Sequence, residues 1–376
     1  MDLNLSPDQQ MLQDMVRKFA TFELEPVASE IDKTQQFPTE IIKKLAKLGL
    51  MGITIPPEYG GAGFDTVSYA IAVEELSKVS ASTGLVVLVN NSLATYPVYL
   101  YGDETQKQKY LTPLAKGDKI GSFALSEIKS GSDISDMETS AVIDGDSYII
   151  NGKKCFVTNG VAAEIFIVFA STDKTKGKDG LSCFIVEREN EGFSVGKNED
   201  LIGMRGAGTC ELDFKDCKAD LIGKEGDGAK VAGDVMDICR IGIAAQAVGI
   251  GQGALEDSIK YSKQREQFGR PICKFQMVQE LLAETATRIS AARLLLYDAA
   301  LKRDLKKPYV KEAAMAKLYA SETAMLAGKN AVQIYGGYGY TKDYPVERYM
   351  RDAKVTEIYE QPSEIQKLII AQKLLE

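Results

Sequence analysis

Acid–base chemistry in this chain must use side chains other than histidine, because its 376 residues include no histidine and no tryptophan. The lack of histidine excludes Ser–His and Cys–His nucleophile pairs, histidine zinc sites and histidine proton transfer. Near the C-terminus, Glu357 and Glu360 flank Tyr359 in an apolar stretch that ends at Pro362. A buried glutamate there could be a general base with a tuned pKa. Taken alone, the pattern is more typical of an exposed acid at a helix end, so both interpretations stay open.

Three polar turns could bind an anion. The run Gly-Gly-Tyr-Gly-Tyr at 336–340 lies between two expected helices and not after a strand, so it does not fit a Rossmann phosphate-binding turn. It indicates either a turn that needs positive φ or a close approach to a cofactor phosphate. The run 265–271 indicates either a solvated helix end or an anion clamp built from two arginines. Ser126-Glu127 with 131–133 indicates either a polar turn or a phosphate or flavin contact.

Composition narrows the class of protein. Hydrophobic residues make up 45% and charged residues 26%, with a net charge of −8, which is typical of a globular protein that binds neither nucleic acid nor anionic membranes. The six cysteines form no C-x-x-C pair, so we expect reduced thiols, no metal site and a cytoplasmic location. We find no signal peptide and no apolar run of about 18 residues, so no membrane span is expected.

The elements that position these residues follow the order helix, strand, helix. Ser6-Pro7-Asp8-Gln9 predicts a capped helix start, and further helices are expected from about Pro38 to Gly49 and from near Thr66. The dipeptides at 144–145 and 151–152 predict hairpin turns, and strands are expected at 165–169, 181–186 and 211–214. Apolar stripes after 229 predict a bundle. The predicted domains are 1–120 (helical), 121–228 (β) and 229–376 (helical).

In order along essentially the whole chain, these and other motifs resemble the acyl-CoA dehydrogenase family, most of all short-chain, butyryl-type members of anaerobic bacteria. The matching segments are Tyr-Gly-Gly at 59–61, Phe-Ala-Leu-Ser-Glu at 123–127, Gly-Ser-Asp at 131–133, Asn-Gly-Lys at 151–153, Thr-Asn-Gly at 158–160, Gly-Met-Arg-Gly at 203–206, Arg-Ile-Gly-Ile-Ala at 240–244, the runs 265–271 and 275–276, the run 333–340, and Glu-Arg, Arg-Asp-Ala and Ile-Tyr-Glu at 347–348, 351–353 and 358–360.

The resemblance implies an α+β fold, with an N-terminal helical domain, a central β-sandwich or barrel and a C-terminal four-helix bundle. It also implies a homotetramer with FAD bound between subunits. Flavin contacts would come from Leu125, Ser126, Gly131, Ser132, Phe156 and Thr158. The adenine and pyrophosphate end would be held by Arg265, Phe268 and Gln276 of a neighbouring subunit, together with Gln333, Gly336 and Gly337.

The implied reaction is oxidation of an acyl-CoA to an enoyl-CoA, with electrons passed to an electron-transferring flavoprotein. Glu360 matches the base that takes the α proton, while the β hydride goes to flavin N5. Asp237 and Arg240 would lie near the CoA portion, and Tyr359 and 87–96 near the acyl group. Within that segment, Asn91 indicates either a helix turn facing solvent or contact with a functionalised or cyclic acyl group.

The chain departs from the family pattern next to the base. Gln361-Pro362 stands where the family has Gly-Thr, and because proline follows, we expect Gln361 to be extended. Phe156 replaces a flavin-stacking tryptophan, and Gly84 stands where glutaryl-CoA members carry an arginine. Three alternatives therefore stay open: a cyclic acyl-CoA substrate with a modified base, an enoyl-CoA reductase working with an electron-transferring flavoprotein, and a non-catalytic flavoprotein.

Overall fold

The computed structural model describes residues 5–376, and helices come first along the chain. The Ser6 hydroxyl accepts a hydrogen bond from the Gln9 N–H at 3.2 Å, and the Gln9 side chain accepts one from the Ser6 N–H at 2.9 Å. This is the capping box that the sequence predicts. The helix starts expected near 38 and 66 are also confirmed. The α-helices of this part are α1 (Pro7–Phe19), α2 (Glu25–Thr34), α3 (Thr39–Lys47), α4 (Thr66–Ser77), α5 (Ala81–Val89), α6 (Thr95–Tyr101), α7 (Glu104–Gln106) and α8 (Thr112–Lys116).

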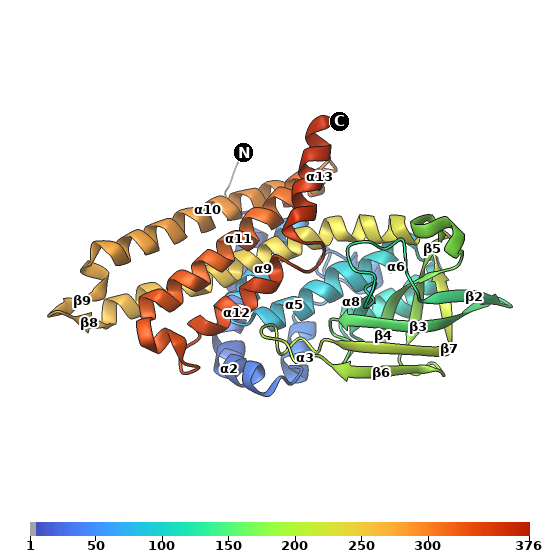
Figure 1. The fold of residues 1–376 in the computed structure, drawn as a ribbon, viewed down its shortest axis with the longest axis horizontal. Helices are drawn as coiled ribbons and strands as arrows, with labels where there is room; N and C mark the ends of the chain where they lie inside the picture. Colours follow the sequence, from blue (N-terminus) through green and yellow to red (C-terminus); the bar gives the residue numbers. More distant parts are fainter. Residues whose placement is uncertain (1–4) are drawn as a thin grey trace.

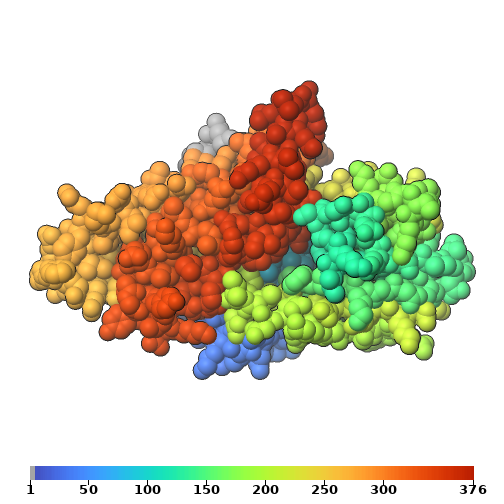
Figure 2. Space-filling model, in the orientation of Figure 1, coloured from blue at the N-terminus to red at the C-terminus, as the bar shows by residue number. Residues whose placement is uncertain are grey.

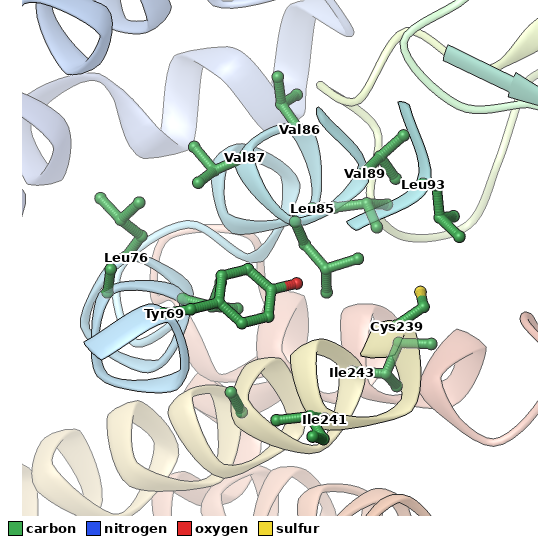
Figure 3. Close-up of a cluster of buried hydrophobic side chains, with 14 of the residues drawn as sticks. Tyr69, Leu76, Leu85, Val86, Val87, Val89, Leu93, Cys239, Ile241 and Ile243 are labelled. Atoms are coloured by element: carbon green, nitrogen blue, oxygen red, sulfur yellow. The ribbon is translucent and has the colours of Figure 1, made fainter. Parts of the chain in front are cut away.

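Helices α4 and α5 form the centre of the molecule, because every residue in both is buried. A helix buried on all sides must be apolar around its whole circumference, and both helices are rich in alanine, valine, leucine and isoleucine. Figure 3 shows apolar side chains from α4, α5 and the later helix α9 gathered around Tyr69.

The middle of the chain forms a β-barrel rather than a sandwich. The pairing runs β4–β2–β3–β7–β5 and returns from β5 to β4, which closes the ring, while β1 pairs with β4 and β6 with β7. Closure removes free sheet edges. The strands are β1 (Gly121–Ala124), β2 (Ser140–Asp144), β3 (Ser147–Val157), β4 (Ile165–Ser171), β5 (Leu181–Glu187), β6 (Phe193–Asn198) and β7 (Cys210–Ile222).

One of the two predicted hairpin turns is wrong. Asp144-Gly145 does turn the chain between β2 and β3, but Asn151-Gly152 lies inside β3, where the register with β7 shifts as in a β-bulge. A Cβ at Gly152 would lie 2.5–2.8 Å from Thr139, so glycine is needed there for close approach. The Asn151 side chain pairs reciprocally with Asp216, donating at 3.1 Å to its carboxylate and accepting from its N–H at 2.8 Å. Asp216 lies 65 residues further along the chain, so the Asn-Gly dipeptide alone does not predict this pairing.

Long helices form the last part of the chain. In Figure 1, α9, α10 and α11 run in alternating directions along the long axis of the molecule, and α13 leaves the others at a steep angle. A short hairpin of β8 and β9 joins α9 to α10 at the end far from the barrel. The elements are α9 (Gly228–Gln264), β8 (Glu266–Gln267), β9 (Arg270–Pro271), α10 (Gln276–Asp304), α11 (Val310–Tyr335), α12 (Val346–Thr356) and α13 (Ser363–Leu375).

Among residues 5–376, α9 is the one helix that is long and apolar enough to cross a membrane by length and composition. Its most apolar window is 94% buried within the protein, which identifies it as a core helix. Glycines bring it very close to α4: a Cβ at Gly249 would lie 2.3 Å from the Glu74 carbonyl oxygen, and one at Gly253 would lie 2.4 Å from that of Lys78. This close contact explains the apolar length of α9.

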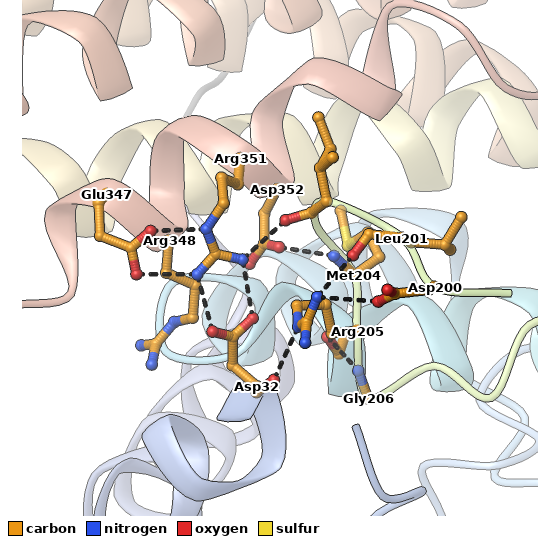
Figure 4. Close-up of polar contacts among 12 residues, drawn as sticks. Asp32, Asp200, Leu201, Met204, Arg205, Gly206, Glu347, Arg348, Arg351 and Asp352 are labelled. Atoms are coloured by element: carbon orange, nitrogen blue, oxygen red, sulfur yellow. Dashed lines mark hydrogen bonds and ion pairs between the residues drawn. The ribbon is translucent and has the colours of Figure 1, made fainter. Parts of the chain in front are cut away.

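Arg351 in α12 joins the parts of the chain (Figure 4). Its guanidinium donates to both carboxylate oxygens of Asp32 in α2, at 2.7 and 3.0 Å, and to both of Glu347, at 2.6 and 2.8 Å. It also donates to the Ile202 carbonyl, between β6 and β7, at 2.8 Å. Fork-to-fork pairing of this kind fixes geometry as well as adding energy. We call this group of residues the Arg351 junction.

The segment between β6 and β7 is held from two further sides. Asp352 accepts the Met204 N–H at 2.6 Å, and burial raises the pKa of this carboxyl to about 6. The Ser82 hydroxyl, in α5, accepts the Gly206 N–H at 3.2 Å. These bonds place α12 relative to the barrel, and therefore also the turn that follows α12.

Removing the Arg351 side chain tests this junction. We expect Arg351→Ala to lower the free energy of unfolding by about 2–4 kcal/mol, because it leaves two partly buried carboxylates facing each other without a cation. Lys354→Ala, on the same helix, is the control: in its pair with Glu357 the lysine side chain is 48% exposed, so the loss should stay below about 1 kcal/mol. Urea unfolding followed by circular dichroism measures both, and equal losses would contradict the role of the junction.

Candidate active site

Glu360 lies in the turn between α12 and α13. Figure 2 shows a hollow where the C-terminal helices meet the β domain. Glu360 and Gln361 have φ values of 48° and 71°. The left-handed region costs a residue with a side chain about 1–2 kcal/mol. The expectation that Gln361 is extended because Pro362 follows is therefore wrong, and surrounding donors must hold the turn in this conformation.

Three side chains from three helices hold Gln361. Lys317 in α11 and Gln366 in α13 both donate to its carbonyl oxygen, Gln366 at 2.9 Å. Arg240 in α9 donates to its side-chain oxygen at 2.5 Å. Tertiary contacts thus override the local preference that proline imposes.

The Glu360 carboxyl is poised between its two protonation states. Desolvation by the surrounding protein raises its pKa to about 7, while the charges of Lys317 and Arg240 oppose this rise. A carboxylate with a pKa near neutrality is matched to the task of a general base at neutral pH. The helix-end acid of the sequence analysis is therefore partly buried and electrostatically tuned.

Three of the predicted substrate-side residues come together around Glu360. Arg240 is only 4% exposed and is ion-paired with Asp237, one turn earlier on α9. Burial raises the pKa of Asp237, and Arg240 opposes the shift. The Tyr359 hydroxyl donates to the side-chain oxygen of Gln246, also on α9. Helix α9 therefore supplies the polar wall of the site.

Lys317 and Gln246 are site residues that the sequence analysis missed. Lys317 is 1% exposed and falls among buried alanines of α11, at the spacing of its inward face. Gln246 is fully buried, and its amide also donates to the Ala81 carbonyl at 2.9 Å. The sequence does carry one signal for both residues: each is a polar side chain at a position where the helix periodicity places apolar, buried side chains.

The interpretation of Asn91 as part of a helix turn facing solvent is wrong, whereas its contact with an acyl group stays a prediction. Asn91 is 1% exposed, so it does not face solvent. Its amide nitrogen donates to the carbonyls of Leu50 and Val87, each at 2.9 Å, and its oxygen accepts the Ile53 N–H at 2.7 Å. These bonds occupy the side chain with backbone, so Asn91 serves to anchor the loop after α3. A polar residue in a buried helix needs such partners.

The flavin-side candidates lie at one edge of the barrel. Leu125 and Ser126 follow β1, and Phe156, with φ 54°, is 63% exposed near the end of β3. Lys154 is fully buried, donates to the Leu125 carbonyl at 3.0 Å and pairs with Glu127 at 2.8 Å. Gly131 has open space around it. The remaining candidates at this edge are Ser132 and Thr158.

Three of the other predicted cofactor residues, Arg265, Gly336 and Gly337, line a second candidate site, at the α9–α10 hairpin and the end of α11. A pocket of about 510 Å³ is lined there by residues that include Tyr261, Arg265, Gly336, Gly337 and Tyr338. The remaining candidates of this group, Phe268, Gln276 and Gln333, are exposed, with Phe268 94% exposed.

One chain does not bring the two cofactor clusters together. The β8–β9 hairpin and the barrel lie at opposite ends of the molecule (Figure 1). Backbone N–H groups and a guanidinium suit a diphosphate, whereas an exposed aromatic ring with nearby hydroxyls suits a flavin ring. The donor chemistry of each cluster thus fits one end of FAD.

Comparison with known proteins agrees with the fold. Models of the acyl-CoA dehydrogenase N-terminal, middle and C-terminal domains match residues 6–118, 122–217 and 226–375. The chain belongs to the acyl-CoA dehydrogenase family. A solved structure that it resembles, 31% identical with a TM-score of 0.94, is described as the FAD complex of PigA.

Individual relatives match over the full length. The short-chain specific acyl-CoA dehydrogenase of Clostridium acetobutylicum is 50% identical, with all of both chains covered. The acryloyl-CoA reductase (NADH) of Anaerotignum propionicum is 46% identical and covers 100% of this chain and 96% of its own. A chain in the structure described as the electron transferring flavoprotein of Acidaminococcus fermentans, towards a mechanism of flavin-based electron bifurcation, is 50% identical with a TM-score of 0.98 and full coverage of both chains.

The raised pKa of Glu360 predicts a pH-dependent stability. Protonation is favoured in the folded state, so the stabilisation is fully present below about pH 4.5 and is lost as the pH rises through about 7. We expect Glu360→Gln to unfold like the parent protein near pH 4.5 and to be more stable at pH 8, by up to about 3 kcal/mol. Thermal unfolding of the FAD-bound proteins from pH 4.5 to 8 measures this, with Glu357→Gln as the control. Parallel curves for Glu360→Gln and the parent protein would contradict the shift.

Proposed function

We propose that this chain oxidises a short, unbranched acyl-CoA thioester to the 2-enoyl-CoA and that Glu360 is the base that removes the α proton. The observation that carries the proposal is the Glu360 carboxyl, held in a left-handed turn, desolvated, and balanced by two buried cations to a pKa of about 7. Family membership supports the reaction class.

The residues of this chain supply binding, orientation and proton transfer. The Glu360 carboxylate takes the α proton, and its own N–H, which has no hydrogen-bond acceptor among residues 5–376, is free to bind the thioester oxygen. Such a donor stabilises the negative charge that develops on that oxygen. Bound FAD supplies the acceptor for the β hydride. Asp237 and Arg240 line the approach of the CoA portion.

Close helix packing supports an acyl group without a second carboxylate. A Cβ at Gly84 in α5 would lie 2.0 Å from the Ser77 hydroxyl oxygen of α4. A larger side chain at this position, such as the arginine that a dicarboxylic acyl group would need, would have to displace this hydroxyl.

The separation of the two cofactor clusters supports a homo-oligomer, which we propose is a tetramer. The hairpin cluster of one subunit would hold the adenine end of an FAD whose flavin lies against the barrel of another. Exposed apolar side chains at the hairpin, Phe268 and Met277 among them, fit burial in such an interface.

The role of Glu360 as base is tested by anaerobic mixing with butyryl-CoA. We expect the parent protein to lose its flavin absorbance and Glu360→Gln to react at least about 100-fold more slowly, because the transferred proton has lost its acceptor. Stopped-flow absorbance measures the rate, and Glu357→Gln, whose carboxylate pairs only with Lys354 among the described residues, should react at the parent rate.

Three results would overturn parts of this proposal. A near-normal rate for Glu360→Gln would move the base elsewhere. Faster flavin bleaching by an alicyclic acyl-CoA than by butyryl-CoA would show that the substrate is a cyclic acyl-CoA and not a short linear one. A panel of linear, branched, dicarboxylic and alicyclic acyl-CoA thioesters tests the last alternative. If none of them bleaches the flavin of the parent protein, the protein is a non-catalytic flavoprotein.

A second candidate is the reverse reaction, an enoyl-CoA reductase that receives electrons from an electron-transferring flavoprotein. It is favoured by the 46% identity to an acryloyl-CoA reductase and by the similarity to a chain in an electron-transferring flavoprotein structure. In the forward direction, the same flavoprotein class would accept the electrons.

Steady-state rates in both directions distinguish the two. Butyryl-CoA with an artificial electron acceptor should turn over faster than crotonyl-CoA with a reduced donor if oxidation is the activity. The opposite order would identify the protein as a reductase.

A further inference from the structure

Lys317 is a buried cation beside the catalytic turn whose bonds all go to backbone. Its ammonium donates to the carbonyl oxygen of Tyr359 at 2.8 Å and to that of Gln361. It is 1% exposed, and no carboxylate among the described residues lies within ion-pair distance. A buried ammonium is costly without strong partners. Its position therefore needs an explanation beyond packing.

The two bonds of Lys317 bracket Glu360. The residue before the base and the residue after it present their carbonyls to one nitrogen, while the backbone between them passes through two left-handed conformations. Gln361 has other donors, Gln366 and Arg240, but Lys317 is the one donor to the Tyr359 carbonyl among residues 5–376. Without Lys317, the N-terminal side of the turn would be free to relax.

We propose that Lys317 is the positioning residue of this active site: it clamps the backbone on both sides of Glu360 and so sets the direction of the carboxylate. The proposal rests on the proposed role of Glu360 as base. An error of about 1 Å in the placement of a reacting group can cost about 100-fold in rate. The clamp would therefore act on the chemical step more than on substrate binding.

The charge of Lys317 has a second effect on Glu360. Burial lowers the pKa of Lys317 to about 8, and Glu360 opposes this change, while Lys317 in turn favours the ionised Glu360. The other groups facing this pair are Arg240 and Cys239 on α9 and the Tyr359 hydroxyl. Asp237 pairs with Arg240, and Tyr69 and Asp352 act on Tyr359. None of these groups duplicates the two backbone bonds.

The test compares Lys317→Met with Lys317→Arg in the FAD-bound protein, using flavin bleaching by butyryl-CoA from pH 5.5 to 9. We expect Lys317→Met to slow bleaching by about 10- to 100-fold, with the butyryl-CoA concentration for half-maximal rate changed less than threefold. The midpoint of the pH–rate profile should move to higher pH, because a cation near Glu360 is gone. Lys317→Arg keeps the charge and two donors, so it should recover part of the rate and the parent midpoint.

Controls separate positioning from a general loss of structure. Lys311→Met removes a partly exposed lysine at the start of the same helix and should leave rate and midpoint unchanged. Combining Lys317→Met with Glu360→Gln should slow the reaction little beyond Glu360→Gln alone, because both act through one group. If Lys317→Met does not fold, Lys317→Arg is used instead. The N–H groups of arginine lie at other positions than the lysine ammonium, so the bleaching rate should still fall while butyryl-CoA binding is unchanged.

The outcomes separate this inference from the proposed function. If Lys317→Met bleaches at the parent rate with the parent pH midpoint while Glu360→Gln is slow, the positioning role of Lys317 is wrong and Glu360 remains the base. Parent activity in folded Lys317→Arg, should Lys317→Met not fold, would also overturn the clamp. Fully additive losses in the double variant would show that Lys317 acts by another route. A normal rate in Glu360→Gln would overturn the proposed base itself.

Discussion

The Arg351 junction is the interaction on which the placement of the catalytic turn depends. It ties α12 to α2 and to the segment between β6 and β7, so one guanidinium links the N-terminal helices, the barrel and the C-terminal helices. The turn that carries Glu360 begins directly after α12. A base in the C-terminal helices can face a cofactor surface on the barrel only if such contacts hold the helices and the barrel in a fixed relative position. The bidentate geometry suits that task because it restrains orientation as well as distance.

The chemistry of the site follows from balancing burial against charge. With no histidine available, a carboxyl must reach a pKa near neutrality, and desolvation alone would raise it further. Arg240 and Lys317 limit the rise, and both also bond to Gln361, next to the base. The same two cations thus tune the acid and shape its backbone. This dual use explains how glutamine and proline are accommodated after the base.

The two candidate cofactor surfaces lie apart in a single chain. The barrel edge around Phe156 and the pocket beside Arg265 have complementary donor chemistry but lie at opposite ends of the molecule. The long helices α9, α10 and α11 set this separation. An assembly in which one subunit completes the site of another would therefore use the length of these helices directly.

Local signals determined much of this protein from the sequence alone. The Ser6 cap, the Asp144-Gly145 turn, the order of helices and strands, and the family all depend on neighbouring residues or on motif order. The choice of Glu360 as base depends on motif order too and stays a prediction. The tertiary structure decided the rest. Asn151-Gly152 became a bulge because Asp216 pairs with it, Asn91 became a core anchor because backbone groups of α3–α4 loops surround it, and Gln361 became left-handed because three helices supply donors. Lys317 shows the same limit: its partners lie 42 and 44 residues away, and only folding brings them within hydrogen-bond distance.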